Sequence, residues 1–266
     1  TKECINALNN GFLLATIYSV PVSLIGFFFG FKIIPLFISD TITTPLAISY
    51  FSISSLGLFF NSMSFVFQGF YTGVEKTRVH LSVTVSSNII NAYLNGGFIY
   101  GKKSISSFFN SAFSGSFDVS FLWFWADFDG LGVSGAALGT LIASIWMVLH
   151  YFYYLNKQTI VKKNKSIFSV GLNNSMLHRQ VRLSLPMGTQ EMMIAIGWSF
   201  FYKIMALIGI LELATTQLLF TIMHASFMPA LGVGQACATL VGKHMGSNEL
   251  KKSEQSINES LRLAEY

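Results

Sequence analysis

Charged residues are scarce in this sequence. Asp, Glu, Lys and Arg together make up 11% of the 266 residues, whereas 52% are hydrophobic. A soluble domain carries charge at about a quarter of its positions. Charge this sparse leaves too little polar surface to cover a globule in water, so the composition excludes an ordinary water-soluble domain.

Several other features are missing. Cysteine occurs only as Cys4 and Cys237, which lie far apart and indicate neither a disulfide framework nor a redox compartment. His150 and His224 have no second ligand at metal spacing, so we expect no metal site and no catalytic centre. Although the net charge is +5, no basic face with interleaved aromatic residues indicates nucleic-acid binding. Alternation over about 10 residues, typical of a membrane β-barrel, is also missing.

Long apolar runs are the main positive feature. Segments of about 20 residues with almost no charge are long enough to cross the hydrocarbon of a bilayer as helices. Helix is expected because lipid offers the backbone no hydrogen-bond partners. We therefore predict an all-α integral membrane protein with about six transmembrane helices. The predicted spans are 11–31, 46–70, 79–100, 130–154, 183–210 and 214–241.

The basic residues are distributed unequally between the two sides that these spans define. One side holds most of the Lys and Arg residues, among them Lys76, Arg78 and Lys163, and the other holds only Lys32, Lys102 and Lys103. Cytoplasmic links carry an excess of positive charge. The rich side is therefore predicted to be cytoplasmic, and the polar insertion 101–129 is predicted to face outward.

The chain divides at a basic linker. We predict a first part at residues 1–155 with four spans, a cytoplasmic linker at 156–182, and a second part at 183–266 with two spans and the beginning of a third. Residues 251–264 can be aligned with residues 2–15, for example Asn258 with Asn9 and Ala264 with Ala15. Internal repeats are common in secondary transporters. The polar start without Met and the helix-like end predict that the chain is a piece of a longer protein.

Glu191 is a carboxylate well inside a predicted span. Counting from Arg182 places it roughly 13 Å deep. An ionisable group at that depth indicates function by default: it can take a proton, bind Na⁺ or hold a cationic substrate. Gln190 is its neighbour, and Trp198 and Tyr202 follow on the same helical face, as suits a cation held against aromatic rings. The alternative is a protonated Glu191 that is bonded to a neighbouring helix.

Amides form two further polar faces. Asn91 and Asn95 lie one turn apart in the third predicted span, and Asn61 and Gln68 lie two turns apart in the second. Such faces are predicted to bind an ion or a substrate, or to hold helices together in the membrane. The sequence leaves both interpretations open.

Four segments resemble the multidrug and toxic compound extrusion (MATE) family. They are QGFYTGVEKTR at 68–78, NAYLN at 91–95, GVSGAALGT at 132–140 and PALGVGQACATLVGKHMG at 229–246. The resemblance implies twelve helices in two lobes related by pseudo-symmetry, of which this chain holds the third to the eighth. It also implies a multi-pass protein of the inner (plasma) membrane whose partners are the bilayer and the remaining helices of the same full-length chain.

The same resemblance implies a role for some residues. Asn91 corresponds to an asparagine of the cation site in the first lobe of the family, and Thr140 to a threonine that lines it. Asn95 stands where one branch has an aspartate. Other branches have a glutamate at the position of Ile194, one turn after Glu191. The insertion 101–129 departs from the short link that is usual in the family.

We therefore expect an antiporter that exports organic cations or amphipathic drugs by alternating access, coupled to H⁺ or Na⁺, with no cofactor beyond the coupling ion. A flippase for lipid-linked saccharides is a rival in the same superfamily, but its cavity would need several basic residues where these spans have only Lys203. A membrane-embedded enzyme would need clustered ionisable groups, which Glu191 alone does not supply. A channel would show flux without counterflow.

Overall fold

The computed structural model describes residues 2–38, 40–112, 120–157 and 173–265. The chain forms two compact units, Thr1–Leu177 and His178–Tyr266. Within the described residues, helices and their links make up both units, and no strand occurs. This is the all-α membrane fold that the composition predicts.

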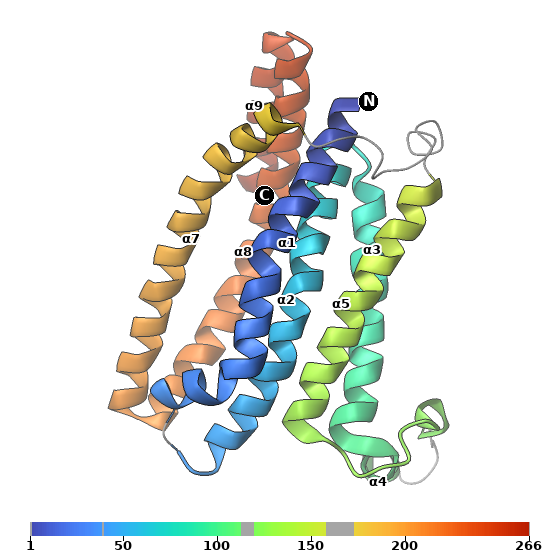
Figure 1. Cartoon of the computed structure of the whole chain (residues 1–266), viewed down its shortest axis with the longest axis vertical. Helices are drawn as coiled ribbons and strands as arrows, with labels where there is room; N and C mark the ends of the chain where they lie inside the picture. The colour runs from blue at the N-terminus through green and yellow to red at the C-terminus, as the bar shows by residue number, and fades with distance from the viewer. Residues whose placement is uncertain (1, 39, 113–119, 158–172, 266) are drawn as a thin grey trace. The chain divides into compact units, whose positions relative to one another are not determined.

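Unit 1 is built on four long helices (Figure 1). They are α1 (Lys2–Ile33), α2 (Thr43–Gly73), α3 (Thr77–Asn95) and α5 (Gly132–Lys157). The 3-10 turn η1 (Ile34–Leu36) follows α1, and the π-helical turn η2 (Gly96–Tyr100) follows α3. Helix α2 packs against both α1 and α5, and α5 also packs against α3. The helices alternate in direction, so the start of α1, the link between α2 and α3, and the end of α5 lie at one end of the unit (Figure 1).

An aromatic cluster fills the centre of unit 1. Phe67, Tyr71 and Tyr151 are completely buried. The rings of Phe67 and Tyr151 stack with their centroids 5.0 Å apart, and Phe12 meets the edge of Phe67 at 4.9 Å. Offset-stacked and edge-to-face pairs of this kind are the favoured arrangements of aromatic rings. The cluster joins α1, α2 and α5 near the end where the chain begins.

The insertion forms structure of its own. It contains the amphipathic helix α4 (Gly101–Ala112) and the short 3-10 helix η3 (Ser120–Trp123). Its described part packs on the end of α3: the indole N–H of Trp123 donates to the carbonyl of Tyr93 at 2.7 Å, and that of Trp125 donates to the Tyr93 hydroxyl at 2.8 Å. The sequence predicts only a polar insertion here, because Ser and Phe in alternation give no long apolar run.

Unit 2 consists of α7 (Asn174–Ile208), α8 (Ile210–Gly246) and α9 (Leu250–Glu265). Gly209 separates α7 from α8, and Asn248, which has the positive φ of 61°, separates α8 from α9. Pro186 and Pro229 lie inside α7 and α8. Helix α7 begins earlier than the predicted end of the linker, because Asn173 Oδ1 accepts a hydrogen bond from the Met176 amide at 3.2 Å and caps it. The rest of the predicted linker, 158–172, lies outside the described residues.

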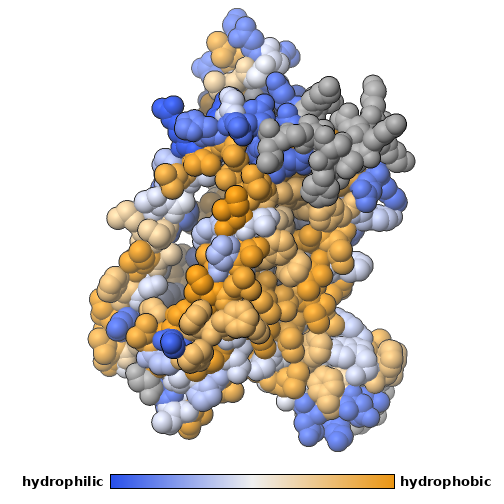
Figure 2. Space-filling model, viewed as in Figure 1, coloured by the Kyte–Doolittle hydropathy of each residue, from blue (hydrophilic) through white to orange (hydrophobic). Residues whose placement is uncertain are grey.

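Five of the described helices are long and apolar enough to cross a membrane: α1 with η1, α2, α5, α7 and α8. Figure 2 shows hydrophobic residues along the sides of the helices in view and hydrophilic residues toward their ends. The third predicted span forms a helix, α3 with η2, but α3 is less apolar because it carries Thr84, Ser86, Ser87, Asn88 and Asn91. Three of them, Ser86, Ser87 and Asn91, hydrogen-bond to residues of α5.

Candidate functional site

A chain of polar side chains joins α3 to α5 in unit 1. Asn91 Nδ2 donates to Thr140 Oγ1 at 3.4 Å, and Asn95 Nδ2 donates to Asn91 Oδ1 at 3.1 Å. The Thr140 hydroxyl in turn donates to the Ala136 carbonyl at 2.9 Å, which leaves its oxygen free to accept from Asn91. The structure thus brings together Asn91, Asn95 and Thr140, three of the residues predicted to line the first-lobe site.

Ser144 extends this chain to α2. Its hydroxyl lies 3.1 Å from Asn61 Oδ1 and 2.9 Å from the Thr140 carbonyl. Asn61 therefore joins the same group of residues, as a ligand from a third helix. Sequence reasoning missed Ser144, although its place one turn after Thr140 on α5 was available as a signal.

Asn95 Oδ1 is the unusual atom of the group. It is buried and has no hydrogen-bond partner among the described residues. A buried acceptor that is left unpaired costs about 1–3 kcal/mol, and such groups are rare in native structures. The oxygens of Asn95, Asn91 and Thr140 are hard, neutral ligands of the kind that bind alkali and alkaline-earth cations.

Glycines on α5 allow the amides to come this close. A Cβ atom at Gly139 would collide with Asn95 Oδ1, and one at Gly135 would collide with the carbonyl of Phe98 in η2. Because these two glycines are four residues apart, both lie on the face of α5 that meets α3. The π-helical turn η2 directly follows Asn95, and single π turns inside helices frequently mark functional sites.

Gln68 does not join this group. It lies about two turns along α2 from Asn61, is half-buried, and makes no side-chain hydrogen bond with the residues that the structure describes. The structure therefore brings together four of the predicted residues in unit 1 and leaves Gln68 apart.

Glu191 is the central residue of α7 (Asn174–Ile208) in unit 2. Glu191 and Gln190 are both exposed, and neither makes a hydrogen bond or ion pair with a described residue. At about 1.5 Å per residue, Glu191 lies roughly 26 Å from each end of α7, which places it near mid-membrane if the helix crosses symmetrically. The side chain is therefore available to a ligand or to another helix.

Tyr202 belongs to a separate aromatic group in unit 2. Its ring lies 6.4 Å from that of Trp198 and 6.0 Å from that of Phe220, and Trp198 meets Phe220 edge-on at 4.5 Å. Tyr202 and Glu191 lie on one face of α7, but about 16 Å apart along its axis. The shared face that the sequence predicts for Glu191 and Tyr202 agrees with helix geometry. The distance along the helix axis is too long for their side chains to contact each other directly.

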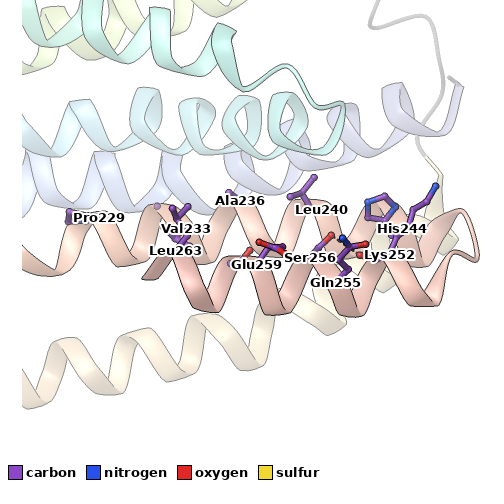
Figure 3. Close-up of a pocket in the computed structure, with 12 residues that line it drawn as sticks. Pro229, Val233, Ala236, Leu240, His244, Lys252, Gln255, Ser256, Glu259 and Leu263 are labelled. Carbon is purple, nitrogen blue, oxygen red and sulfur yellow. Dashed lines mark hydrogen bonds between the residues drawn. The ribbon is translucent and has the colours of Figure 1, made fainter. Parts of the chain in front are cut away.

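A groove of about 700 Å³ lies between α8 and α9 (Figure 3). Pro229, Ala236 and Leu240 form its apolar side, and Lys252 and Glu259 belong to its polar side. None of the residues predicted to form a site lines this groove. On α8, the small residues Gly232 and Ala236 are part of its lining.

An ionic link closes the end of this groove. The Glu249 carboxylate accepts from Lys252 Nζ at 2.8 Å and pairs with His244 Nδ1 at 3.1 Å. The hydrogen bond from Lys252, followed by that from His244, lowers the pKa of Glu249. The link joins the end of α8 to the start of α9. Among the described residues, no group of three or more His, Cys, Asp or Glu side chains is arranged to hold a metal ion.

The chain is similar to known proteins over part of its length. The MatE family model matches residues 1–96, which include α1, α2, α3 and both site asparagines of α3. A probable multidrug resistance protein NorM of Thermotoga maritima is 24% identical over 185 residues, which are 70% of this chain and 34% of that protein. The matched region is thus about a third of the length of this curated relative. The first third of the chain is thus similar to the MatE family model, and 70% of the chain is similar to a protein named for multidrug resistance, in agreement with the MATE resemblance of the four sequence segments.

Proposed function

We propose that the protein containing this chain is a cation-coupled antiporter that exports organic cations or amphipathic drugs by alternating access. The chain supplies parts of two lobes: residues 1–155, and residues 183–266 after a cytoplasmic linker. Further helices of the same protein complete the lobes, and the protein lies in the inner membrane. The name of the Thermotoga relative, a probable multidrug resistance protein, supports this substrate class.

The unpaired oxygen of Asn95 is the observation that carries the proposal. It lies in a group with Asn91, Thr140 and Asn61 that offers neutral oxygens from three helices. A cation that binds there satisfies the oxygen that the protein leaves unpaired. Because the ligands come from α2, α3 and α5, a small movement between these helices changes the affinity for the ion. Such a difference in affinity between two states is what coupling requires.

Glu191 supplies the negative charge in the second lobe. A carboxylate at the centre of α7 binds the positive charge of an exported cation or takes the coupling proton. Gln190 adds an adjacent amide, and Tyr202 with Trp198 adds aromatic faces further along the helix. Export then requires that Glu191 hold its cation in one state and release it in the other.

Ethidium efflux from membrane vesicles that contain the full-length protein tests this proposal. Glu191→Gln should abolish efflux without reducing the amount of protein in the membrane. Glu212→Gln, which removes a carboxylate from the first turn of α8, is the matched control and should retain efflux. Unchanged efflux in Glu191→Gln would reject the role of this carboxylate.

Imposed gradients test the coupling. Efflux by the unmodified protein should follow either an inward pH gradient or an inward Na⁺ gradient, and Asn95→Leu should remove that dependence. The control is Asn88→Leu, which changes an exposed amide two turns earlier on α3. Flux that is independent of both gradients would contradict antiport and favour a channel.

A further inference from the structure

The insertion holds the end of α3 in an aromatic clamp. Trp123 and Trp125 both donate their indole N–H groups to Tyr93, and the ring of Trp123 stacks on that of Tyr93 with centroids 5.6 Å apart. The Lys102 amide also donates to the Ala126 carbonyl at 2.9 Å, which ties α4 to the segment after η3. These bonds hold the described part of the insertion against the end of α3 and against η2.

Two adjacent glycines form the surface against which the two tryptophan rings pack. A Cβ atom at Gly96 would lie 3.1 Å from the Trp123 ring, and one at Gly97 would lie 2.5 Å from the Trp125 ring. Larger residues would push both rings away. The pair Gly96-Gly97 and the pair Trp123 and Trp125 are therefore complementary surfaces, 26 residues or more apart in the sequence.

A pocket of about 430 Å³ opens beside this clamp, and its described lining comes from η2, α4 and η3. Among the described residues, six line it: Gly96, Tyr100, Ser104, Ile105, Phe108 and Trp123. Its volume falls in the range of small-molecule sites, which are concave and mostly apolar with few polar groups. Its apolar lining consists of the rings of Tyr100, Phe108 and Trp123 and the buried side chain of Ile105. The hydroxyl of Ser104 is its polar group.

The lining selects for a flat, apolar ligand. Rings of Trp, Tyr and Phe present planar faces, and Gly96 presents no side chain, so a planar aromatic group can lie between them. None of the described lining residues is charged, so the pocket requires no charge on its ligand. The pocket also lies next to the polar group of unit 1, because Gly96 directly follows Asn95.

We propose that this pocket is a binding site for planar aromatic compounds at the end of α3, next to the Asn91–Asn95 group. The site contains neither Glu191 nor the oxygens of the polar group. A compound can therefore bind in the pocket without being transported. In a protein that exports aromatic drugs, it holds the aromatic part of the compound at the side of the membrane opposite the α2–α3 link.

The uncharged fluorophore N-phenyl-1-naphthylamine tests the binding, because it accepts energy from excited tryptophan. The full-length protein in lipid nanodiscs, with Trp146→Phe and Trp198→Phe, keeps Trp123 and Trp125 as the donors within this chain. We expect saturable energy transfer to the fluorophore. Ser104→Phe, which fills the pocket, should abolish the saturable part, whereas Lys103→Phe adds the same ring outside the lining and should retain it.

A second pair of variants tests the aromatic wall without filling the pocket. Phe108→Ala removes an exposed ring of the lining and should weaken binding about tenfold. Phe124→Ala removes a ring that is 75% exposed and outside the lining, and should have no effect. Equal saturable transfer in Ser104→Phe and Lys103→Phe, or equal affinity in the two alanine variants, would overturn the proposal.

The two proposals fail separately. Glu191→Gln is expected to stop ethidium efflux and to leave energy transfer to N-phenyl-1-naphthylamine intact. Efflux without any saturable transfer would reject the aromatic pocket and leave the antiport proposal standing. Saturable energy transfer that Ser104→Phe abolishes, in a protein without coupled efflux, would support the aromatic pocket and reject the antiport proposal.

Discussion

The side-chain amide of Asn95 lies directly against the backbone of Gly139, so that no side chain fits between them. We expect Gly139→Ala to separate α3 from α5 and to destabilise the protein by about 1–3 kcal/mol, as overpacking does in a close-packed interior. Thermal unfolding of the purified full-length protein measures this loss. The control is Gly69→Ala in α2, where an added Cβ atom would meet open space. This variant should unfold at the same temperature as the unmodified protein.

The hydroxyl of Ser144 is the link between α5 and Asn61 of α2. Ser144→Ala should cost about 0.5–1.5 kcal/mol, the net contribution of one hydrogen bond. A double-mutant cycle with Asn61→Ala should show coupling between the two positions, because either substitution removes the same hydrogen bond between Ser144 and Asn61. Ser134→Ala, earlier on α5, makes no side-chain hydrogen bond with a described residue and should be neutral. Additive losses in the cycle would show that Ser144 and Asn61 do not interact.

Phe67 is the centre of the aromatic cluster of unit 1. In lipid the transfer term of burial is small, so the expected loss in Phe67→Ala comes from the cavity that the ring leaves. At about 24 cal/mol per Å³, a cavity of roughly 100 Å³ destabilises by about 2 kcal/mol. Phe65→Ala, two residues away and 71% exposed, should change the free energy of unfolding by less than about 0.5 kcal/mol. Equal losses in both variants would place the cluster outside the stable core.

The Glu249 link between α8 and α9 predicts a pH dependence. The pKa of Glu249 is lowered by Lys252 and His244, so the stabilisation is present above the ordinary pKa of 4.5 and is lost as the pH falls through the lowered value. At neutral pH, Glu249→Gln should therefore speed hydrogen exchange at the Lys252 and Ser253 amides, which bond to the Glu249 carbonyl. Below the lowered pKa, the variant and the unmodified protein should exchange alike. A difference that persists in acid would mean that charge is not the cause.

Much of the architecture could be predicted because the membrane simplifies the problem. Runs such as 46–70 and 130–154 form helices since the backbone has no other way to satisfy its hydrogen bonds in lipid. The ends of the helices were harder to predict, because caps such as Asn173 lie in polar sequence where periodicity gives no signal. The insertion was predicted as polar, yet Trp123 and Trp125 dock on a glycine pair that only a folded structure brings within reach.

The candidate site was partly visible in the sequence. Asn91 and Asn95 are one turn apart, so helix geometry alone places them together. Asn61 and Thr140 come from other helices, and their meeting depends on how α2 and α5 pack. Gln68 shares a face with Asn61 but lies too far along the helix axis to join. The roles predicted for Glu191, Gln190 and Tyr202 remain predictions, to be tested by transport.

The sequence by itself determined that this chain has apolar helical segments long enough to cross a membrane and that it resembles the MATE transporters, because apolar length and local motifs are properties of consecutive residues. Only the tertiary structure decided that Asn95 keeps an unpaired oxygen beside Gly139 and that the insertion makes an aromatic pocket. Both depend on distances between residues far apart in the chain, and those distances are set by the packing of glycine faces and rings rather than by any local pattern.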